Sequence, residues 1–381
     1  MDVSLRVLQQ DADWSALRPA WDEIVDSQSA SILGPDVTCT STWTEVLWEN
    51  HLKRQKLEAL VGESHGRIDA ILPFYRVRKT VHFVPCRSLV ATCKLYDGRG
   101  GFVLRNAPLE GLAALLAGLK TCVSGWDVFF FTLVENSSAH NALLQLENRR
   151  GFRLEKVESH PSPYFLMNTT WEEYFAALQN RFRGQLRKFE KRARAAGDLT
   201  YKVFESGPDL DYFYDSVRQI ERQSWKEKAG TSLTANEVQD RFHARIMHAA
   251  ADRGWMSGHL LELNGEPIAY QFGLIYNGVF YDLKGSFKDQ FREIGAGRVM
   301  YRLLIEELFR RKVAIFDFQG VCHDFKMRLT DKTYRTSTYL LYNDTLAAHA
   351  ARLAGYAARF IPAKRSAPQE NHEPNVSSES G

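Results

Sequence analysis

The sequence predicts an α/β (α+β) protein of two domains, each with a mixed central sheet flanked by helices. Three observations lead to this prediction. The chain has 381 residues and is 44% hydrophobic, which is more than one average core needs and enough for two. Segments of strand patterning alternate with segments of helical periodicity. The pattern breaks around Pro161 to Pro163, and a second series of helices and strands begins there.

The first half alternates between helical and strand-like segments. Helical patterning occurs at 14–25, 43–52, 109–119 and 138–149, and strand patterning occurs at 57–62, 70–77 and 126–134. Gly151 is expected to end the last of these helices. The stretch Asp97-Gly98-Arg99-Gly100-Gly101 predicts a loop that turns sharply or approaches a ligand, because glycine lacks a Cβ.

The second half begins with a predicted aromatic helix at 171–178 and a strongly basic segment at 181–194. The basic segment holds seven Lys or Arg residues against one Glu. Such a run of charge usually forms a solvated helix face, which is the interpretation we favour. The alternative is a surface for an anionic partner such as phosphate groups, an acidic glycan or RNA.

Two Asn-Gly pairs predict an antiparallel meander of three strands. They separate the strand-like runs 260–263, 267–276 and 279–283, and Asn-Gly is the preferred pair in a two-residue type I′ hairpin. With loops of two residues, Tyr276 is expected to face Val279. The same register places Gly273 opposite Asp282, and Gln271 opposite Lys284.

Strand alternation then sorts the side chains of this meander onto two faces. Gln271, Asp282 and Lys284 are expected to share a polar face beside the gap left by Gly273. The other face is apolar, with Phe272, Leu274, Tyr276, Tyr281 and Leu283. The polar group is either an ion-paired structural cluster or part of a site, and the pattern leaves both interpretations open.

The strongest functional signal is the loop Arg292-Glu293-Ile294-Gly295-Ala296-Gly297, which immediately precedes a helix with apolar residues at helical spacing. The first turn of a helix leaves backbone N–H groups without internal partners, and glycines let an anion come close to them. Alternatively, the glycines only let the helix pack tightly. The order of three strands, loop, helix and a further strand at Ile315 to Phe318 favours the anion site.

In this arrangement the chain resembles the GNAT acetyltransferase superfamily, whose acyl-CoA pyrophosphate loop has the pattern Arg-x-x-Gly-x-Gly. Within it, residues 171–342 resemble CelD-like acetyltransferases associated with exopolysaccharide and cellulose biosynthesis. The resemblance rests on QLRKFEKRARAAG, NGEPIAYQFGLIYNGVFYD and IFDFQGVCHDFKMRLT. TSTWTEVLWENHL and AILPF extend it to the first half. One position departs from the family, because Phe325-Lys326 stands where Tyr-Lys is frequent.

The resemblance implies two tandem GNAT-like domains, as in the related Fem-type peptidyl transferases. We expect a degenerate first domain at 1–165, an acyl-CoA-binding domain at 166–345, and a helix with a disordered tail at 346–381. The first domain has no Arg-x-x-Gly-x-Gly loop, so it is expected to shape the acceptor cleft or a homodimer contact. The residues implied for binding acetyl-CoA or another acyl-CoA are Arg292, Gly295, Ala296, Gly297 and Arg298.

The implied reaction is direct transfer of the acyl group to an amine, on a small molecule or a glycan. A general base must remove the amine proton. The first candidate is Asp282, on the polar strand face, and the alternative is Asp317, after the cofactor helix. Each could instead be an ion-pair partner, of Lys284 and of Lys326 respectively. Lys326 is also a candidate catalytic residue that holds an anionic group of the acceptor or the cofactor, and Gln271, Lys284 and Lys326 are candidates for binding the acceptor.

Bulk properties exclude several function classes. With 49 basic and 46 acidic residues, no global field selects nucleic acid or a membrane as partner, so any electrostatic function must be local, and nucleic acid is not an expected partner. The five cysteines form no CxxC pair and the eleven histidines form no HxxxH or HxH cluster, so neither a disulfide framework nor a metal cofactor is expected. A cytoplasmic location, with no membrane span and no targeting segment, is the simplest expectation. Residues 363–381 are expected to form a disordered tail.

Two other functions remain open. One is an aminoacyl-tRNA-dependent Fem-type peptidyl transferase, in which the basic segment 181–194 would meet RNA, although such proteins usually carry a longer helical insertion for tRNA. The other is a non-catalytic partner protein of a polysaccharide assembly, because a fold alone does not establish catalysis.

Overall fold

The computed structural model describes residues 4–8, 11–27, 30–34, 36–51, 57–92, 99, 101–105, 108–147 and 152–358. The predicted tail at 363–381 and most of the glycine-containing loop at 97–101 lie outside these residues. The first half comprises β1 (Ser4–Leu8), α1 (Asp11–Asp26), α2 (Ser41–His51), β2 (Leu57–Ser64), β3 (Arg67–Val81), β4 (Val84–Ala91), β5 (Val103–Leu104), α3 (Pro108–Cys122), β6 (Val128–Val134) and α4 (Ser138–Glu147).

One strand, β7 (Arg153–Leu166), leads into the second half. The second half comprises α5 (Trp171–Ala177), α6 (Asn180–Ala195), β8 (Leu199–Phe204), α7 (Leu210–Arg222), α8 (Trp225–Lys228), α9 (Glu237–Asp252), β9 (Met256–Leu263), β10 (Glu266–Tyr276), β11 (Val279–Phe287), α10 (Ala296–Arg310), β12 (Ile315–Asp317), α11 (Asp324–Met327), β13 (Thr333–Tyr342) and α12 (Leu346–Ala358).

The strands form one continuous 13-stranded sheet in the order β1-β2-β3-β4-β6-β13-β7-β12-β11-β10-β9-β8, with β5 beside β3. The same topology occurs twice. The meander β2-β3-β4 is followed by α3 and by β6 parallel to β4, and the meander β9-β10-β11 is followed by α10 and by β12 parallel to β11. The expected mixed α/β fold, with helices flanking a central sheet, is confirmed.

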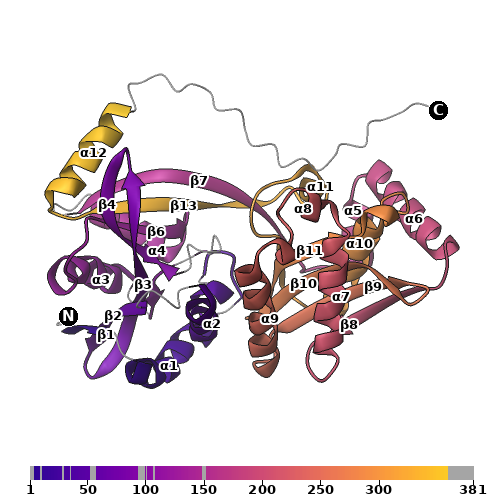
Figure 1. Ribbon diagram of the computed structural model, residues 1–381, viewed down its shortest axis with the longest axis horizontal. Coiled ribbons are helices and arrows are strands. Elements are labelled where there is room, and N and C mark those ends of the chain that lie inside the picture. Colours follow the sequence, from indigo (N-terminus) through magenta and orange to yellow (C-terminus); the bar gives the residue numbers. More distant parts are fainter. Residues whose placement is uncertain are drawn as a thin grey trace.

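The two halves exchange their last strands. β13 lies between β6 of the first half and β7, and α12 follows it onto the first half (Figure 1). β7 in turn pairs with β12 through residues 164–166. The division expected at 165/166 stays a prediction, and β13 crosses it in space.

β7 passes without interruption through Pro161 and Pro163, where the sequence pattern predicted a break. The N–H of Tyr164 bonds to the carbonyl of Lys332 next to β13, at 3.1 Å, whereas the carbonyl of Pro163 accepts from Phe318 on the opposite side, at 3.2 Å. Because strand residues alternate in direction, the nitrogens of both prolines point away from β13. The ladder with β13 therefore loses no donor.

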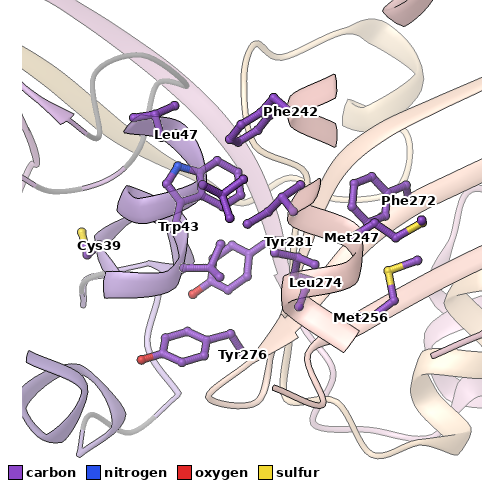
Figure 2. Close-up of a cluster of buried hydrophobic side chains, with 14 of the residues drawn as sticks. Cys39, Trp43, Leu47, Phe242, Met247, Met256, Phe272, Leu274, Tyr276 and Tyr281 are labelled. Carbon is purple, nitrogen blue, oxygen red and sulfur yellow. The ribbon is translucent and has the colours of Figure 1, made fainter. Parts of the chain in front are cut away.

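A large buried apolar cluster contains side chains from both halves. It takes Trp43 and Leu47 from α2, and Phe242 and Met247 from α9, and Figure 2 shows these side chains in one cluster with Phe272 and Leu274 of β10 and Tyr281 of β11. The rings of Trp43 and Phe242 meet edge to face, with centroids 5.3 Å apart. A large apolar contact of this kind holds two domains in a fixed relation.

Candidate functional site

The site begins where β11 and β12 separate. The two strands pair in parallel from Val279 and Ile315 to Tyr281 and Asp317, where β12 ends, whereas β11 continues to Phe287. The chain returns from the end of β11 through α10 to β12. The N-terminus of α10 therefore lies at the carboxyl end of β11, which is where open α/β sheets place their ligands.

The loop before α10 has the backbone conformation of an anion site. Gly295 is the N-cap residue of α10 and has φ +71°, in the left-handed region. Its carbonyl accepts the N–H groups of Arg298 and Val299 at 2.9 and 3.0 Å. Among the described residues, no hydrogen-bond acceptor faces the N–H groups of Ala296 and Gly297. Two donors at the positive end of the helix dipole are thus available to an anion.

Both glycines of this loop also have a packing role. The ring of Phe189, on α6, occupies the place where a Cβ at residue 295 would stand, and Phe287 Cδ1 would lie 2.8 Å from a Cβ at residue 297. Arg298 stacks on the Phe189 ring, 4.9 Å from its centroid. Arg292 bonds to Asp289 at 2.8 Å. Tight packing, which was the alternative interpretation of the glycines, therefore applies at both positions, and the free N–H groups remain available in addition.

Asp282 lies on the face of β11 that α10 covers. Its carboxylate accepts a hydrogen bond from the Tyr301 hydroxyl at 2.7 Å and another from the side-chain amide of Gln271. Burial raises the pKa of Asp282, and the positive charge of Lys326 opposes this. The gap expected beside Gly273 is filled by the ring of Phe280. Gln271, Asp282 and Lys326 are thus brought together, with Tyr301 as a further member.

Lys284 does not join this group. Gly273 faces Asp282 as expected, but the register then shifts, so that Phe272 faces Lys284 and Gln271 faces Gly285. The extra residue is Leu283, which forms a β-bulge in β11. The bulge turns Lys284 to the opposite face of the sheet. There burial and the charge of the neighbouring Lys226 lower the pKa of Lys284, so the expected pairing of Lys284 with Gln271 was wrong.

Asp317 is held by Arg99 from the first half. The Arg99 Nε atom lies 3.6 Å from both Asp317 and Asp36, and all three side chains are almost completely buried. Arg99 also donates to the Tyr281 hydroxyl at 2.8 Å and to the Ile32 carbonyl at 2.7 Å. Burial raises the pKa of Asp317 to about 6, although the Arg99 charge opposes the rise.

The expected pairing of Asp317 with Lys326 is therefore replaced by a contact between the halves. The Lys326 ammonium group instead donates to the carbonyls of Phe318 and Gln319, at 3.1 and 3.2 Å. Since Asp317 pairs with Tyr281 in the sheet and Asp282 is the next residue, the two candidate bases point to opposite faces. Only Asp282 lies on the side of α10.

Sequence reasoning missed three members of these clusters: Tyr301, Arg99 and Asp36. Tyr301 lies on the predicted helix, but nothing in the helical periodicity marks its hydroxyl. Arg99 lies in the glycine-containing loop that was expected to turn sharply or to approach a ligand. Its guanidinium instead approaches a carboxylate more than 200 residues away in the chain.

No group of three or more His, Cys, Asp or Glu side chains in the described ranges is arranged to hold a metal ion. The same residues contain no helix that is both long and apolar enough to cross a membrane.

Comparisons with known proteins agree with this architecture. Residues 180–327 match the model of a family described as acetyltransferase (GNAT) domain. Among solved structures, the chain is similar to FemX, with a TM-score of 0.61 at 12% identity over 91% of this chain and 99% of that one. It is also similar to a conserved protein of unknown function from Bacteroides thetaiotaomicron, with a TM-score of 0.57 at 12% identity over 88% and 100%.

A tandem GNAT protein from the clavulanic acid biosynthesis pathway gives a TM-score of 0.50 at 12% identity, over 88% of this chain and 98% of that one. A search of curated proteins finds no match. At these identities the structural similarities describe the fold, which is GNAT-like with tandem-GNAT neighbours. The family match assigns residues 180–327 to a GNAT acetyltransferase domain, and it confirms the predicted enzyme class, an acyltransferase.

Proposed function

We propose that the chain is an acyl-CoA-dependent N-acyltransferase that transfers an acetyl or related acyl group to an amine. The main support for this proposal is the loop before α10. Gly295 has the left-handed conformation there, and the N–H groups of Ala296 and Gly297 can donate to an anion. The pyrophosphate of an acyl-CoA suits these donors, because two backbone N–H groups and the helix dipole both favour negative charge. Arg298, in the first turn of α10, adds a cation beside them.

Asp282 is the proposed general base. Tyr301 and Gln271 hold its carboxylate in one orientation, and its raised pKa brings its proton affinity closer to that of a base working near neutral pH. The amine nitrogen bonds to the thioester carbonyl carbon, Asp282 takes the amine proton, and the coenzyme A thiolate leaves. Lys326 lies near enough to Asp282 to influence its charge, and is proposed to hold an anionic group of the acceptor.

The proposed acceptor of the acyl group is an amine on a sugar or polysaccharide precursor. The resemblance to CelD-like proteins supports an amine on a sugar or polysaccharide precursor, and the exchange of strands between the halves supports a cleft to which the first half contributes. A cytoplasmic site of action fits an acyl-CoA donor, and a homodimer remains a further proposal.

A second candidate function is supported by α6 and by the similarity to FemX. The basic side chains of α6 face solvent, including Arg187, Lys188 and Arg192, whereas Phe182 and Leu186 are buried. This is the solvated helix face that we favoured, and it also suits the phosphates of an aminoacyl-tRNA donor. Binding of tRNA that weakens steeply with salt, together with indifference to acyl-CoA, would favour this function.

The test is thermal stabilisation by a panel of acyl-CoAs. A ligand at about 100 times its Kd stabilises the native state by about 2.7 kcal/mol. Bulky residues at positions 295 and 297 would collide with Phe189 and Phe287, so Arg298→Glu is the better variant. It places a carboxylate in the first turn of α10, which suits the helix dipole but repels pyrophosphate.

The matched control is Arg310→Glu, which makes the same charge change at the other end of α10. The proposal requires the acyl-CoA-induced shift to be lost in Arg298→Glu and kept in Arg310→Glu. If the wild-type protein is stabilised by no acyl-CoA, the proposal fails and a non-catalytic partner role gains support.

A further inference from the structure

Helix α12 is packed with its small residues inward and its large apolar residues outward. Ala348, Ala351 and Gly355 face the sheet of the first half and are buried. Leu346, Leu353 and Tyr356 are 89%, 70% and 62% exposed. At 100° per residue these two sets lie on opposite sides of the helix. An apolar helix face is thus left open to solvent.

The turn between β3 and β4 extends this surface. The ring of His82 lies where a side chain at Gly355 would stand, so the turn packs against α12 beside Tyr356. The next residue, Phe83, is 87% exposed. Both turn residues have positive φ, at 44° and 71°, a conformation that normally selects Asn-Gly. A bulky aromatic ring is held outward in a backbone conformation that disfavours it. We call Phe83, Leu346, Leu353 and Tyr356 the outer apolar surface.

A basic pocket opens beside the outer apolar surface. It has a volume of about 570 Å³, and Arg78, Lys79 and Arg87 line it together with Leu346. Among the described residues of the lining, Asp127 is the one carboxylate, and it bonds to Arg87 at 2.8 Å. These described residues therefore supply three cations and one carboxylate, which gives the pocket lining a net positive charge. Leu346 belongs to both features, which makes them one continuous surface.

Further basic residues border the same surface. Arg352 is exposed on α12, and no carboxylate of the described residues forms an ion pair with Arg352 or Arg78. The nearby Glu155 and Asp344 already have partners, His82 for Glu155, and Lys120 with Arg153 for Asp344. In the sequence, Arg359, Lys364 and Arg365 follow α12. The ligand of this surface must therefore be both apolar and anionic.

Two occupants fit this surface poorly. Phe360 and Ile361 follow α12 directly in the sequence, but residues 363–381 contain one large apolar residue, Val376, so this tail lacks the side chains needed to cover four exposed apolar side chains. A second copy meeting this one across a two-fold axis would set the basic pocket against the same pocket, with like charges opposed. A bilayer with anionic headgroups offers an apolar phase and phosphate groups together.

We propose that the outer apolar surface and its basic pocket dock this protein onto the surface of an anionic lipid bilayer. Leu346, Leu353, Tyr356 and Phe83 enter the boundary between headgroups and acyl chains, and the basic pocket receives lipid phosphate. The protein lies on the membrane and does not span it. α12 lies at the outer end of one half of the molecule and α10 lies in the other half (Figure 1), so docking leaves the acyl-CoA loop accessible. This surface is independent of the proposed reaction.

The test is co-sedimentation of the full chain with vesicles of phosphatidylcholine, alone or mixed with phosphatidylglycerol. The wild-type protein is expected to bind the mixed vesicles, less so as salt rises, and to stay in solution with phosphatidylcholine alone. The double variant Leu353→Ser/Tyr356→Ser removes apolar area from the membrane boundary, and the double variant Arg78→Glu/Arg352→Glu reverses two charges that face the lipid phosphates. Each should weaken partitioning by roughly 30-fold or more. The substituted side chains are exposed, so both variants should keep the wild-type circular dichroism and melting temperature.

Two control variants carry matched substitutions on helices away from the outer apolar surface. Leu144→Ser removes an exposed apolar side chain from α4, and Lys188→Glu/Arg192→Glu reverses two exposed cations on α6; both should bind as the wild type does. The proposal would be overturned if Lys188→Glu/Arg192→Glu lost vesicle binding while Leu353→Ser/Tyr356→Ser and Arg78→Glu/Arg352→Glu both kept it. Binding to phosphatidylcholine alone at the same level would also overturn it. So would a dimer, seen by analytical ultracentrifugation, that Leu353→Ser/Tyr356→Ser dissociates.

Discussion

Replacing Arg99 by methionine would leave Asp36 and Asp317 buried without the cation that lies 3.6 Å from each of them. The change would also remove the hydrogen bonds from Arg99 to the Tyr281 hydroxyl and to the Ile32 carbonyl. Removing one partner from a buried ion pair costs about 3–5 kcal/mol, because an uncompensated charge stays buried. We expect the free energy of unfolding to fall by this amount.

This loss corresponds to a measurable change in melting temperature. The entropy of unfolding is about 2.1 cal/mol/K per residue, which gives roughly 0.8 kcal/mol/K for a chain of this length. The midpoint of thermal unfolding should therefore fall by roughly 4–6 °C at pH 8. Calorimetry and denaturant titration both measure the change.

The loss should depend on pH in a defined direction. The pKa of Asp317 in the folded state is about 6, raised by burial above its ordinary value of 3.8, even with Arg99 present. Without Arg99 this pKa should rise further. A group whose pKa is raised on folding stabilises the fold at low pH, and that contribution is lost as pH rises through the folded pKa. The deficit of Arg99→Met should thus be largest at pH 8 and smaller at pH 5.

Arg310→Met is the matched control, because Arg310 is 73% exposed and pairs with Glu307 on the surface. Such a pair contributes about 0–1 kcal/mol. Arg99→Met behaving like this control at pH 8, or showing the same deficit at pH 5 and pH 8, would refute the role assigned to the buried cluster.

Three further predictions concern single positions. Asp282→Asn should lower kcat by about 10²- to 10⁴-fold without weakening acyl-CoA binding, and full turnover in the variant would remove Asp282 from the mechanism. In the wild-type protein, kcat should decline at acidic pH as Asp282 takes up a proton, and the pKa of this decline should lie above the ordinary carboxylate range because burial raises the pKa of Asp282. Gly295→Ala should destabilise the fold by about 1–3 kcal/mol, because residue 295 has a positive φ and its Cβ would meet Phe189; unchanged stability in denaturant titration would contradict this. Trp43→Ala should lower the free energy of unfolding by about 3–5 kcal/mol. Because both halves share this core, amide hydrogen exchange should become faster in α9 as well as in α2, and a change confined to α2 would argue against a shared core.

Local signals in the sequence predicted local structure well. The pairs Asn264-Gly265 and Asn277-Gly278 form the expected turns with positive φ at all four residues, and Gly273 faces Asp282 as the loop length required. The bulge at Leu283 was not predictable, because strand parity assumes a regular ladder. One inserted residue was enough to move Lys284 to the other face of the sheet.

Contacts between residues far apart in the chain could not be predicted from the sequence. A buried arginine such as Arg99 needs acceptors, but its partner Asp317 comes from the other half of the chain, and no spacing encodes that contact. The exchange of β13 into the sheet of the first half is likewise invisible to periodicity, since any strand of the same pattern could pair there. Two prolines in β7 suggested a break because sequence alone does not tell which edge of a strand their nitrogens face.

Hydrogen–deuterium exchange with and without acetyl-CoA would show whether acyl-CoA binds at the N-terminus of α10. The amides of peptides covering residues 292–300 should exchange more slowly when acetyl-CoA is present, because the N–H groups of Ala296 and Gly297 would then have acceptors, and this protection should be absent in Arg298→Glu. Protection by acetyl-CoA elsewhere in the chain, with residues 292–300 unaffected, would mean that acyl-CoA does not bind at the N-terminus of α10.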